Sequence, residues 1–336
     1  MLVAVPCSDD DCVLLLDAAD GTERGRVAVG DHPVHLAVVD SRVFVATMGD
    51  RAVSVVADGA VRRVETGVLG PSHFATTDAG DVLVPCTGGD ALAVVDAERL
   101  TLRARVGVGA EPHDVAVRDG LAYVGSRADG VVTVVDPTTG TVEATHDLGS
   151  DARIQGVEAT DEGVYAVDQR NARLFRVTAG SVEGSVPVGA NPYDAVVADA
   201  RVLVAGRGDA TVTAVSRRRA VGAVGDGDPR VYDVGGRPSG VVVANGDAWV
   251  LDRERSHVAP LADPPATDGR AGAGASPTRR RVELPHPTFA AETAPDDAVV
   301  YVSHYDDAAV SAVDLEAGRV VWTAETPAHP FEPAVV

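Results

Sequence analysis

A pattern of about 40 residues recurs along the whole chain, and it restricts the fold to architectures built from repeated units. Each copy starts with a short turn that leads through a proline into an apolar run. One copy carries Ile154 in the proline position. The prolines that mark the other copies are Pro33, Pro71, Pro112, Pro192, Pro238, Pro287 and Pro330. Successive markers lie 38 to 49 residues apart, so one repeat architecture explains all 336 residues without a second domain.

Every copy contains further short apolar segments after the first one. The second segments include VFVATMGD, AYVGSRADG and VYVSHYDD, the third include AVSVV, VVTVVD and AVSAVD, and the fourth include RARVGVG. These segments are rich in valine and are bounded by Gly, Asp or Pro, which is typical of β-strands joined by tight turns. No segment has the periodicity of an amphipathic helix. The pattern predicts an all-β chain of four-stranded units.

The two ends of the chain complement each other. Residues 329–336 supply only a first strand, and residues 1–30 supply only the second, third and fourth strands. We therefore expect a β-propeller of eight blades that closes by pairing the two ends in one blade, because closure removes exposed sheet edges. The predicted blades are residues 31–69, 70–109, 110–149, 150–189, 190–235, 236–285, 286–328, and 329–336 with 1–30. Residues 262–281 are rich in Pro, Gly, Ala and Arg and are predicted to be a flexible insertion. Seven blades remain the alternative if the irregular residues 217–285 hold fewer strands than these bounds assign to them.

The charge composition is strongly one-sided. The net charge is −21, and all 29 basic residues are arginine, because the sequence contains no lysine. This composition resembles that of proteins from halophilic archaea, whose acidic surfaces stay hydrated where salt screens their repulsion. A genome rich in G and C would also favour arginine over lysine. In either case the negative field argues against a nucleic-acid partner.

Three observations bear on the location of the protein. The first residues reach Asp9 without a basic segment, so no signal peptide is expected. No apolar run approaches the roughly 20 residues of a membrane helix, so no membrane partner is expected. The cysteines, Cys7, Cys12 and Cys86, lack the paired spacing of a zinc site and are expected to be reduced thiols. Together these features predict a cytoplasmic protein.

The second and third strands of the repeat resemble those of a known family. The stretches Val43–Asp50, Tyr123–Asp129 and Val300–Asp307 are similar to the YVTN-type repeat, with Tyr301-Val302-Ser303-His304 as the nearest match to the name-giving Tyr-Val-Thr-Asn. The resemblance covers nearly the whole chain and implies a YncE-like β-propeller related to the propeller of cytochrome d1. It implies the fold and leaves the function open.

Aligning the copies places most of the histidines at one mouth of the central channel. The position two residues after the proline reads His35, His73, Asp114, Gly156, Asp194, Gly240, Phe289 and Glu332. The position before it reads Val34, Ser72, His113, Gln155, Tyr193, Ser239, Thr288 and Phe331. The loop after the second strand contributes Thr47, Ser126, Arg127, Asp168, Arg207, Asp252, Arg253, His304 and Tyr305, among others. We expect these loops to converge at the mouth, where propellers usually carry their sites.

These residues suggest several chemistries. His35, His73 and His113 are candidate ligands of a transition metal ion, since neutral imidazoles suit such ions. Tyr193, Phe289 and Tyr305 are candidates for lining a cofactor such as a tetrapyrrole.

A hydrolase or lyase is a further alternative. Arg127, Arg207 and Arg253 are candidates to clamp an anionic group, with His113 or His304 as general base. Asp168 and Asp252 are further catalytic candidates at the same mouth. The simplest interpretation is that the residues at the mouth are polar only because they contact solvent. Since nothing in the sequence fixes a reaction, we expect a scaffold that binds a small molecule or a protein at the channel mouth.

Overall fold

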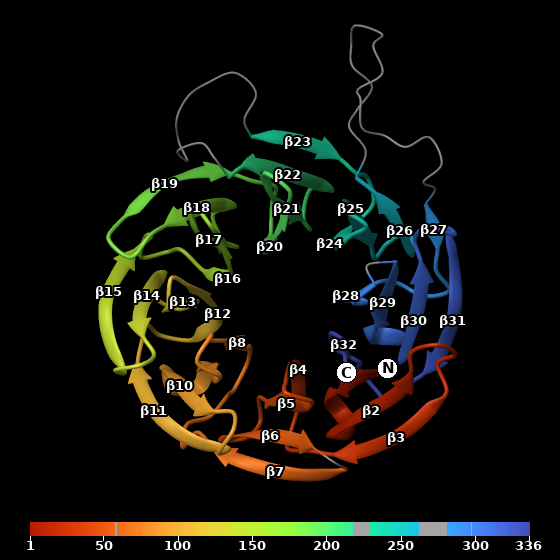
Figure 1. Cartoon of the computed structure of the whole chain (residues 1–336). Coiled ribbons are helices and arrows are strands. Elements are labelled where there is room, and N and C mark those ends of the chain that lie inside the picture. The colour runs from red at the N-terminus through yellow and green to blue at the C-terminus, as the bar shows by residue number, and fades with distance from the viewer. Residues whose placement is uncertain (58, 218–228, 262–280, 297) are drawn as a thin grey trace, which may run out of the picture.

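The computed structural model describes residues 1–57, 59–217, 229–261, 281–296 and 298–336. These residues form eight four-stranded antiparallel sheets arranged as blades around a central channel (Figure 1). The prediction of an eight-bladed propeller is confirmed, and the seven-blade alternative is wrong. Most of the predicted insertion, residues 262–280, lies outside the described residues.

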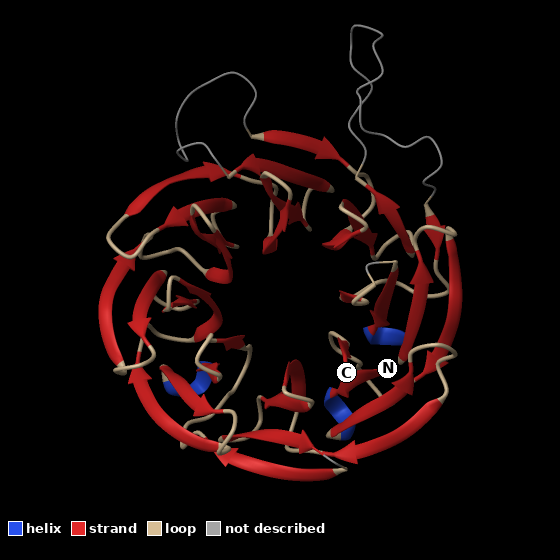
Figure 2. Ribbon diagram, in the orientation of Figure 1, coloured by secondary structure: helices blue, strands red, loops and turns tan. Residues whose placement is uncertain are grey.

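Strands account for nearly all of the regular structure (Figure 2). The first four blades contain β4 (Pro33–Val39), β5 (Arg42–Thr47), β6 (Ala52–Ala57) and β7 (Ala60–Glu65); β8 (Ala75–Thr76), β9 (Asp81–Cys86), β10 (Ala91–Asp96) and β11 (Thr101–Gly107); β12 (Pro112–Arg118), β13 (Leu121–Ser126), β14 (Val131–Asp136) and β15 (Thr141–Asp147); and β16 (Ile154–Thr160), β17 (Gly163–Asp168), β18 (Arg173–Val177) and β19 (Val182–Pro187).

The remaining blades follow the same order. They contain β20 (Pro192–Ala198), β21 (Arg201–Gly206), β22 (Thr211–Ser216) and β23 (Arg230–Asp233); β24 (Pro238–Ala244), β25 (Asp247–Asp252), β26 (His257–Pro260) and β27 (Val282–Glu283); β28 (Ala291–Thr293), β29 (Val299–His304), β30 (Ala309–Asp314) and β31 (Arg319–Glu325); and β32 (Ala334–Val335), β1 (Leu2–Cys7), β2 (Cys12–Asp17) and β3 (Glu23–Ala28). The helical turns among the described residues are three short 3-10 segments, η1 (Ser8–Asp10), η2 (Thr87–Gly89) and η3 (Tyr305–Asp307). No helix in these parts of the chain is long and apolar enough to cross a membrane.

The ring closes by pairing the two ends of the chain. Ala334 and Val335 of β32 pair with Ala4 and Val3 of β1. The backbones of Leu2 and Val336 exchange two hydrogen bonds of 2.9 Å. The expected closure is confirmed, and the terminal blade has four strands like the others.

The burial pattern explains the apolar runs in the sequence. Middle strands such as β9 are buried on both faces, because each blade is packed between two neighbours. Outer strands such as β31 alternate between exposed and partly buried residues. The core clusters accordingly span adjacent blades; Leu83 and Leu92, for example, belong to the same cluster as Val115 and Val124 of the next blade. The core is thus a series of inter-blade layers, and the channel side is left to the first strands.

Candidate functional site

A β-bulge near the start of the first strand separates the two aligned positions at the channel mouth. In five blades the register of the first strand against the second shifts just after the marker residue. A bulge adds one residue to its strand and redirects the neighbouring side chains. The position two residues after the marker faces the channel, whereas most residues at the position directly after it are buried against the next blade.

The residues directly after the marker connect neighbouring blades. The Ser72 hydroxyl donates to the carbonyl oxygen of His113 at 2.7 Å. Nδ1 of His113 lies 2.7 Å from the carbonyl oxygen of Gln155, and the hydroxyls of Ser239 and Thr288 lie 2.9 Å apart. Burial lowers the pKa of His113 to about 3, so this imidazole is neutral. His113 therefore fastens two blades together and does not line the channel cavity.

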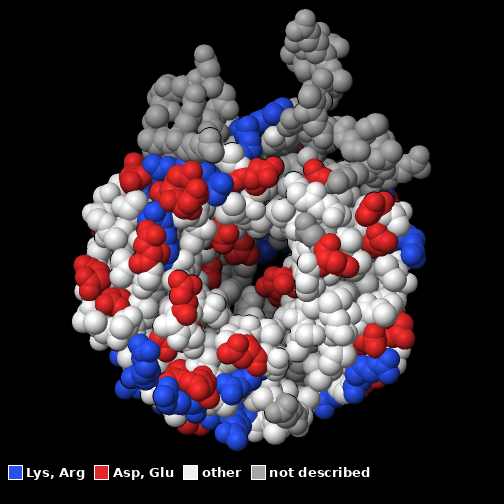
Figure 3. All heavy atoms as spheres, in the orientation of Figure 1, with Lys and Arg blue, Asp and Glu red and all other residues white. Residues whose placement is uncertain are grey.

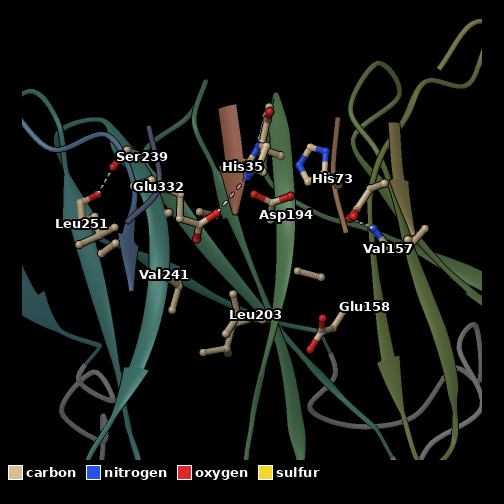
Figure 4. Close-up of a pocket in the computed structure, with 18 of the residues that line it drawn as sticks. His35, His73, Val157, Glu158, Asp194, Leu203, Ser239, Val241, Leu251 and Glu332 are labelled. Atoms are coloured by element: carbon tan, nitrogen blue, oxygen red, sulfur yellow. Dashed lines mark hydrogen bonds and ion pairs between the residues drawn. The ribbon is translucent and has the colours of Figure 1, made fainter. Parts of the chain in front are cut away.

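A cavity of about 500 Å³ opens in the channel beside the other aligned position. Seven of the eight residues two positions after the marker line it, all except Gly156. Its polar lining residues are His35, His73, Asp114, Glu158, Tyr193, Asp194, Arg207, Ser239 and Glu332. The apolar part of its wall includes Phe74, Val157, Leu203, Val241, Leu251, Phe289 and Phe331. Figure 4 shows His35, His73, Asp194 and Glu332 at one level and Glu158 farther along the channel.

The two cavity-lining histidines stack on each other. The ring centroids of His35 and His73 lie 3.9 Å apart with 30° between the planes. His35 also lies 3.4 Å from the Glu332 carboxylate through Nδ1. Burial lowers the pKa of His73 well below its usual range, and its buried Nδ1 has no hydrogen-bond partner among the described residues.

The predicted metal site is not assembled. Stacked imidazoles turn their faces to each other, whereas shared metal coordination requires ring nitrogens that converge on one point. His113, the third predicted ligand, is engaged with the next blade. In the described parts of the chain no group of three or more His, Cys, Asp or Glu residues has an arrangement that could hold a metal ion.

Several carboxylates face the cavity, and Figure 3 shows acidic side chains on the wall of the central opening. Burial, and then the neighbouring charges of Asp114 and Asp194, raise the pKa of Glu158 to about 7. Burial and Asp114 likewise raise the pKa of Asp194 to about 7. Asp194 is nevertheless an exposed residue, because it faces the channel.

Asp114 has a different environment from these two acids. Its carboxylate accepts hydrogen bonds of 2.8 Å from the backbone nitrogens of Val115 and Val157, the second of which belongs to the next blade. Burial nevertheless raises its pKa to about 6. Neither Glu158 nor Asp194 has a hydrogen-bond or ion-pair partner among the described residues. The cavity therefore holds acids that no described residue pairs with directly, although the charge of Arg207 acts on Asp194 from nearby.

The three candidate arginines are separated. Arg207 lines the cavity, stacks over the Tyr193 ring at 4.0 Å and donates from Nε to the Ser239 carbonyl oxygen at 2.9 Å. Arg127 lies 3.7 Å from Glu111, and Arg253 is paired with Asp306; neither lines the cavity. The predicted three-arginine anion clamp is therefore not formed.

The other catalytic candidates are held by local structural contacts. Both ring nitrogens of His304 are engaged, with the Pro287 carbonyl oxygen at 2.9 Å and the Ser311 hydroxyl at 2.8 Å. Asp168 accepts four hydrogen bonds, from the backbones of Arg153, Arg170 and Asn171 and from the Asn171 side chain. Each of these two residues stabilises the loop next to the end of its own second strand, and both lie outside the cavity lining.

Asp252 repeats the role of Asp168 two blades later. Its carboxylate accepts hydrogen bonds from the backbones of Arg237 at 3.2 Å and Arg255 at 3.0 Å. At this aligned position the two Asp side chains therefore stabilise a turn, because each accepts hydrogen bonds from nearby backbone N–H groups.

Aromatic rings form one side of the mouth. Phe289 packs against Tyr305 at 4.9 Å and edge-on against Phe331 at 5.3 Å. Three of the five phenylalanines in the chain, Phe74, Phe289 and Phe331, line the cavity. Tyr305 supports Phe289 from behind and does not itself line the cavity.

These residues do not fit the tetrapyrrole considered above. Tetrapyrroles carry carboxylate side chains, which need cationic partners. The cavity presents four acids (Asp114, Glu158, Asp194 and Glu332) against one arginine, and that arginine is already stacked on Tyr193. The electrostatic field of the cavity has the wrong sign for such a group.

The aligned positions of the repeat copies do not include Glu158, although it lines the cavity. Glu158 lies two residues beyond Gly156 in β16, and alternate residues of a strand share a face. The sequence does show a glutamate inside an apolar first strand, two residues after the channel-facing position, and this pattern predicts a side chain that faces the channel. Glu292, whose pKa burial raises to about 7, lines a second cavity of about 380 Å³ that shares Glu332 with the first.

No protein-family model matches the chain, and no curated protein sequence matches it. Many solved structures share its fold. Apo AztD from Citrobacter koseri is 16% identical with a TM-score of 0.68, over 99% of this chain and 96% of that chain. The dihydro-heme d1 dehydrogenase NirN is 14% identical with a TM-score of 0.75, over 99% of this chain and 74% of that chain. A streptogramin B lyase is 11% identical with a TM-score of 0.60, over 81% and 90%. At these identities the likeness establishes the propeller fold.

Proposed function

We propose that the chain is a binding propeller whose small-molecule ligand occupies the channel cavity, without catalysis of its own. The proposal rests on a cavity of about 500 Å³ whose wall combines apolar side chains with convergent polar groups. Small-molecule sites have this size and composition. A rigid ring of blades holds the lining, since every first strand is paired within its own sheet.

Binding is favoured over hydrolysis or lyase chemistry by the way the candidate catalytic groups are engaged. His113 and His304 are buried and hydrogen-bonded in the framework, and burial lowers the pKa of His304 to about 4. Arg127 and Arg253 form ion pairs away from the cavity. A nucleophile activated by an adjacent base, which group-transfer chemistry requires, is not found among the described lining residues.

The setting of this function is part of the same proposal. We assign the chain to the YVTN-type, YncE-like propellers of a halophilic organism and place it in the cytoplasm. The three cysteines are few and lack the paired spacing of a disulfide or zinc framework, which supports a reducing compartment. The net charge of −21 supports a salt-rich environment and a partner other than nucleic acid.

A cavity-filling substitution tests the binding site. A Cβ atom at Gly240 would meet only Leu251 Cδ1 at 3.9 Å, so Gly240→Phe projects a ring into the cavity without a backbone clash. The matched control is Gly107→Phe on the outer strand β11, where a Cβ atom meets nothing within 4 Å.

A small-molecule library is screened by thermal shift against the wild type and both variants. We expect compounds that stabilise the wild type and Gly107→Phe but not Gly240→Phe. The proposal fails if the library stabilises none of the proteins, or if every stabilising compound also stabilises Gly240→Phe.

A further inference from the structure

The channel cavity combines aromatic surface with acids that have no partner in the protein. Phe289 and Phe331 lie on its wall with ring centroids 5.3 Å apart. Glu158 and Asp194 lie on the wall without a hydrogen bond or an ion pair to any described residue. An aromatic face and a carboxylate both attract a cation, the first through its quadrupole and the second through its charge.

Arg207, the arginine among the described lining residues, faces Asp194 but is not paired with it. The Arg207 guanidinium stacks on Tyr193 at 4.0 Å and donates to the Ser239 carbonyl oxygen, so it is held against the wall. No ion pair joins Arg207 to a cavity acid within the described residues. The stack also shows that a ring of this cavity accepts a cation on its face.

The histidines do not supply the missing positive charge either. The buried Nδ1 of His73 has no hydrogen-bond partner, and this ring stacks on His35. Charging both stacked rings would place two positive charges within 3.9 Å of each other. His35 already lies next to Glu332. Among the described residues Asp194 and Glu158 thus have no direct positive partner, and a cation in the cavity would supply one.

The size and shape of the cavity argue against a bare inorganic ion. The volume of about 500 Å³ is far larger than one ion, and much of the wall is apolar, as at Leu203, Val241 and Leu251. An inorganic cation in such a space would keep its water shell and leave the apolar wall unused. A molecule with an apolar body and an ammonium group uses both parts of the wall.

We propose that the ligand of this cavity is an organic cation, an amine with an aromatic or aliphatic body, whose ammonium group lies against Asp194 and Glu158 and whose body packs on Phe289 and Phe331. This inference rests on the proposed function and gives the chemical class of its ligand. The unpartnered acids then have a purpose, since they provide the charge that selects amines over neutral or anionic molecules of the same shape.

Three probes with nearly the same skeleton and different charge test the inference. Tryptamine is a cation, tryptophol is neutral and indole-3-acetate is an anion. Their binding is measured by titration calorimetry near pH 8, at one salt concentration in all experiments. We expect tryptamine to bind at least about tenfold more tightly than tryptophol and indole-3-acetate not to bind. Equal affinity of the three probes, or tighter binding of indole-3-acetate, overturns the inference.

Two variants separate a local effect from a general effect of charge. Asp194→Asn removes one cavity acid, and Glu316→Gln removes one exposed acid from a turn far from the cavity lining. We expect Asp194→Asn to weaken tryptamine binding about tenfold or more while Glu316→Gln leaves it unchanged. Equal effects of the two substitutions contradict the assignment of Asp194.

The Gly240→Phe variant distinguishes a failure of the inference from a failure of the proposed function. If tryptophol or indole-3-acetate binds best and Gly240→Phe abolishes that binding, the cavity is a binding site but its ligand is not a cation. If Gly240→Phe abolishes the binding of no probe and of no library compound, the binding function itself is contradicted. A titration with KCl and MgCl2 completes the test. If an inorganic cation binds at Asp194 and tryptamine does not bind, the assignment of an organic cation is overturned.

Discussion

Nδ1 of His113 lies 2.7 Å from the backbone carbonyl oxygen of Gln155, and this contact joins two neighbouring blades. The same blade junction holds the Asp114 carboxylate on the backbone nitrogen of Val157 at 2.8 Å. His113 was a natural candidate for a metal ligand or a base, yet its place between the blades assigns it to the framework.

Replacing His113 therefore affects stability more than binding. His113→Ala leaves the carbonyl oxygen of Gln155 buried without this partner, and we expect it to lower the free energy of unfolding by about 1 to 3 kcal/mol. His35→Ala, which alters a ring in the water-accessible channel, is the control and should cost clearly less. Chemical denaturation of both variants checks this, and a larger loss for His35→Ala would contradict the assignment.

The raised pKa of Asp194 makes a prediction whose sign differs from that of most surface acids. An acid with a pKa of about 7 in the folded chain and about 4 in the unfolded chain binds more protons when folded. Its contribution to the free energy of unfolding therefore falls as the pH rises from about 4 to about 7.

Asp194→Asn should accordingly raise the melting temperature at pH 8 and leave it nearly unchanged at pH 4.5. The charged groups that face Asp194 are Asp114, Arg207, Glu332 and His35. They remain in place in the variant, so its difference from the wild type isolates one carboxylate. Thermal unfolding at the two pH values provides the measurement; a lower melting temperature for the variant at pH 8 would show that the acid has a stabilising partner.

Asp168 should behave as a structural acid. It accepts four hydrogen bonds around the loop after β17 and is almost completely buried. We expect Asp168→Ala to lower the free energy of unfolding by about 1 to 3 kcal/mol, because the N–H groups around this loop lose their acceptor. The exposed Glu254→Ala is the control with little effect. A catalytic or ligand-binding role would instead appear as unchanged stability with lost binding.

Removing the last three residues tests the closure of the ring. Ala334 and Val335 form β32, the short innermost strand of the terminal blade, and Val336 exchanges two hydrogen bonds with Leu2 of β1. Their deletion exposes the β1 edge, and we expect a loss of several kcal/mol in the free energy of unfolding together with a tendency to associate through that edge. Denaturation and light scattering measure the two effects. An unchanged midpoint would mean that closure adds no stability.

The acidic composition predicts a dependence on salt. With a net charge of −21, repulsion between like charges opposes folding at low ionic strength. Raising KCl from about 0.1 M to about 2 M should therefore raise the melting temperature, since screening shortens the range of that repulsion. A melting temperature that is flat or falling with KCl would contradict adaptation to high salt.

The sequence predicted the blade count and the closure because each depends on strand patterns that repeat along the chain. It also predicted that the position two residues after the marker, occupied by His35, Asp194 and Phe289 among others, would converge on one site, and seven of its eight members line the cavity. Alignment in columns succeeds here because each blade places the same position at the same radius.

The chemistry of the site was less accessible. His35 and His113 stand in adjacent columns, and only the bulge sends the first toward the channel and the second between blades. Glu158 was missed because it lies two residues farther along its first strand than the aligned position. Which acids lack a partner depends on distances between different blades, and no local sequence spacing records those distances.

A crystal structure of the wild type grown with tryptamine shows whether the channel cavity binds an organic cation. The predicted result is electron density in the channel with the amine nitrogen within hydrogen-bond distance of Asp194 or Glu158 and the indole against Phe289 and Phe331. A channel that contains only water, or density for tryptamine confined to the outer surface, would contradict the claim.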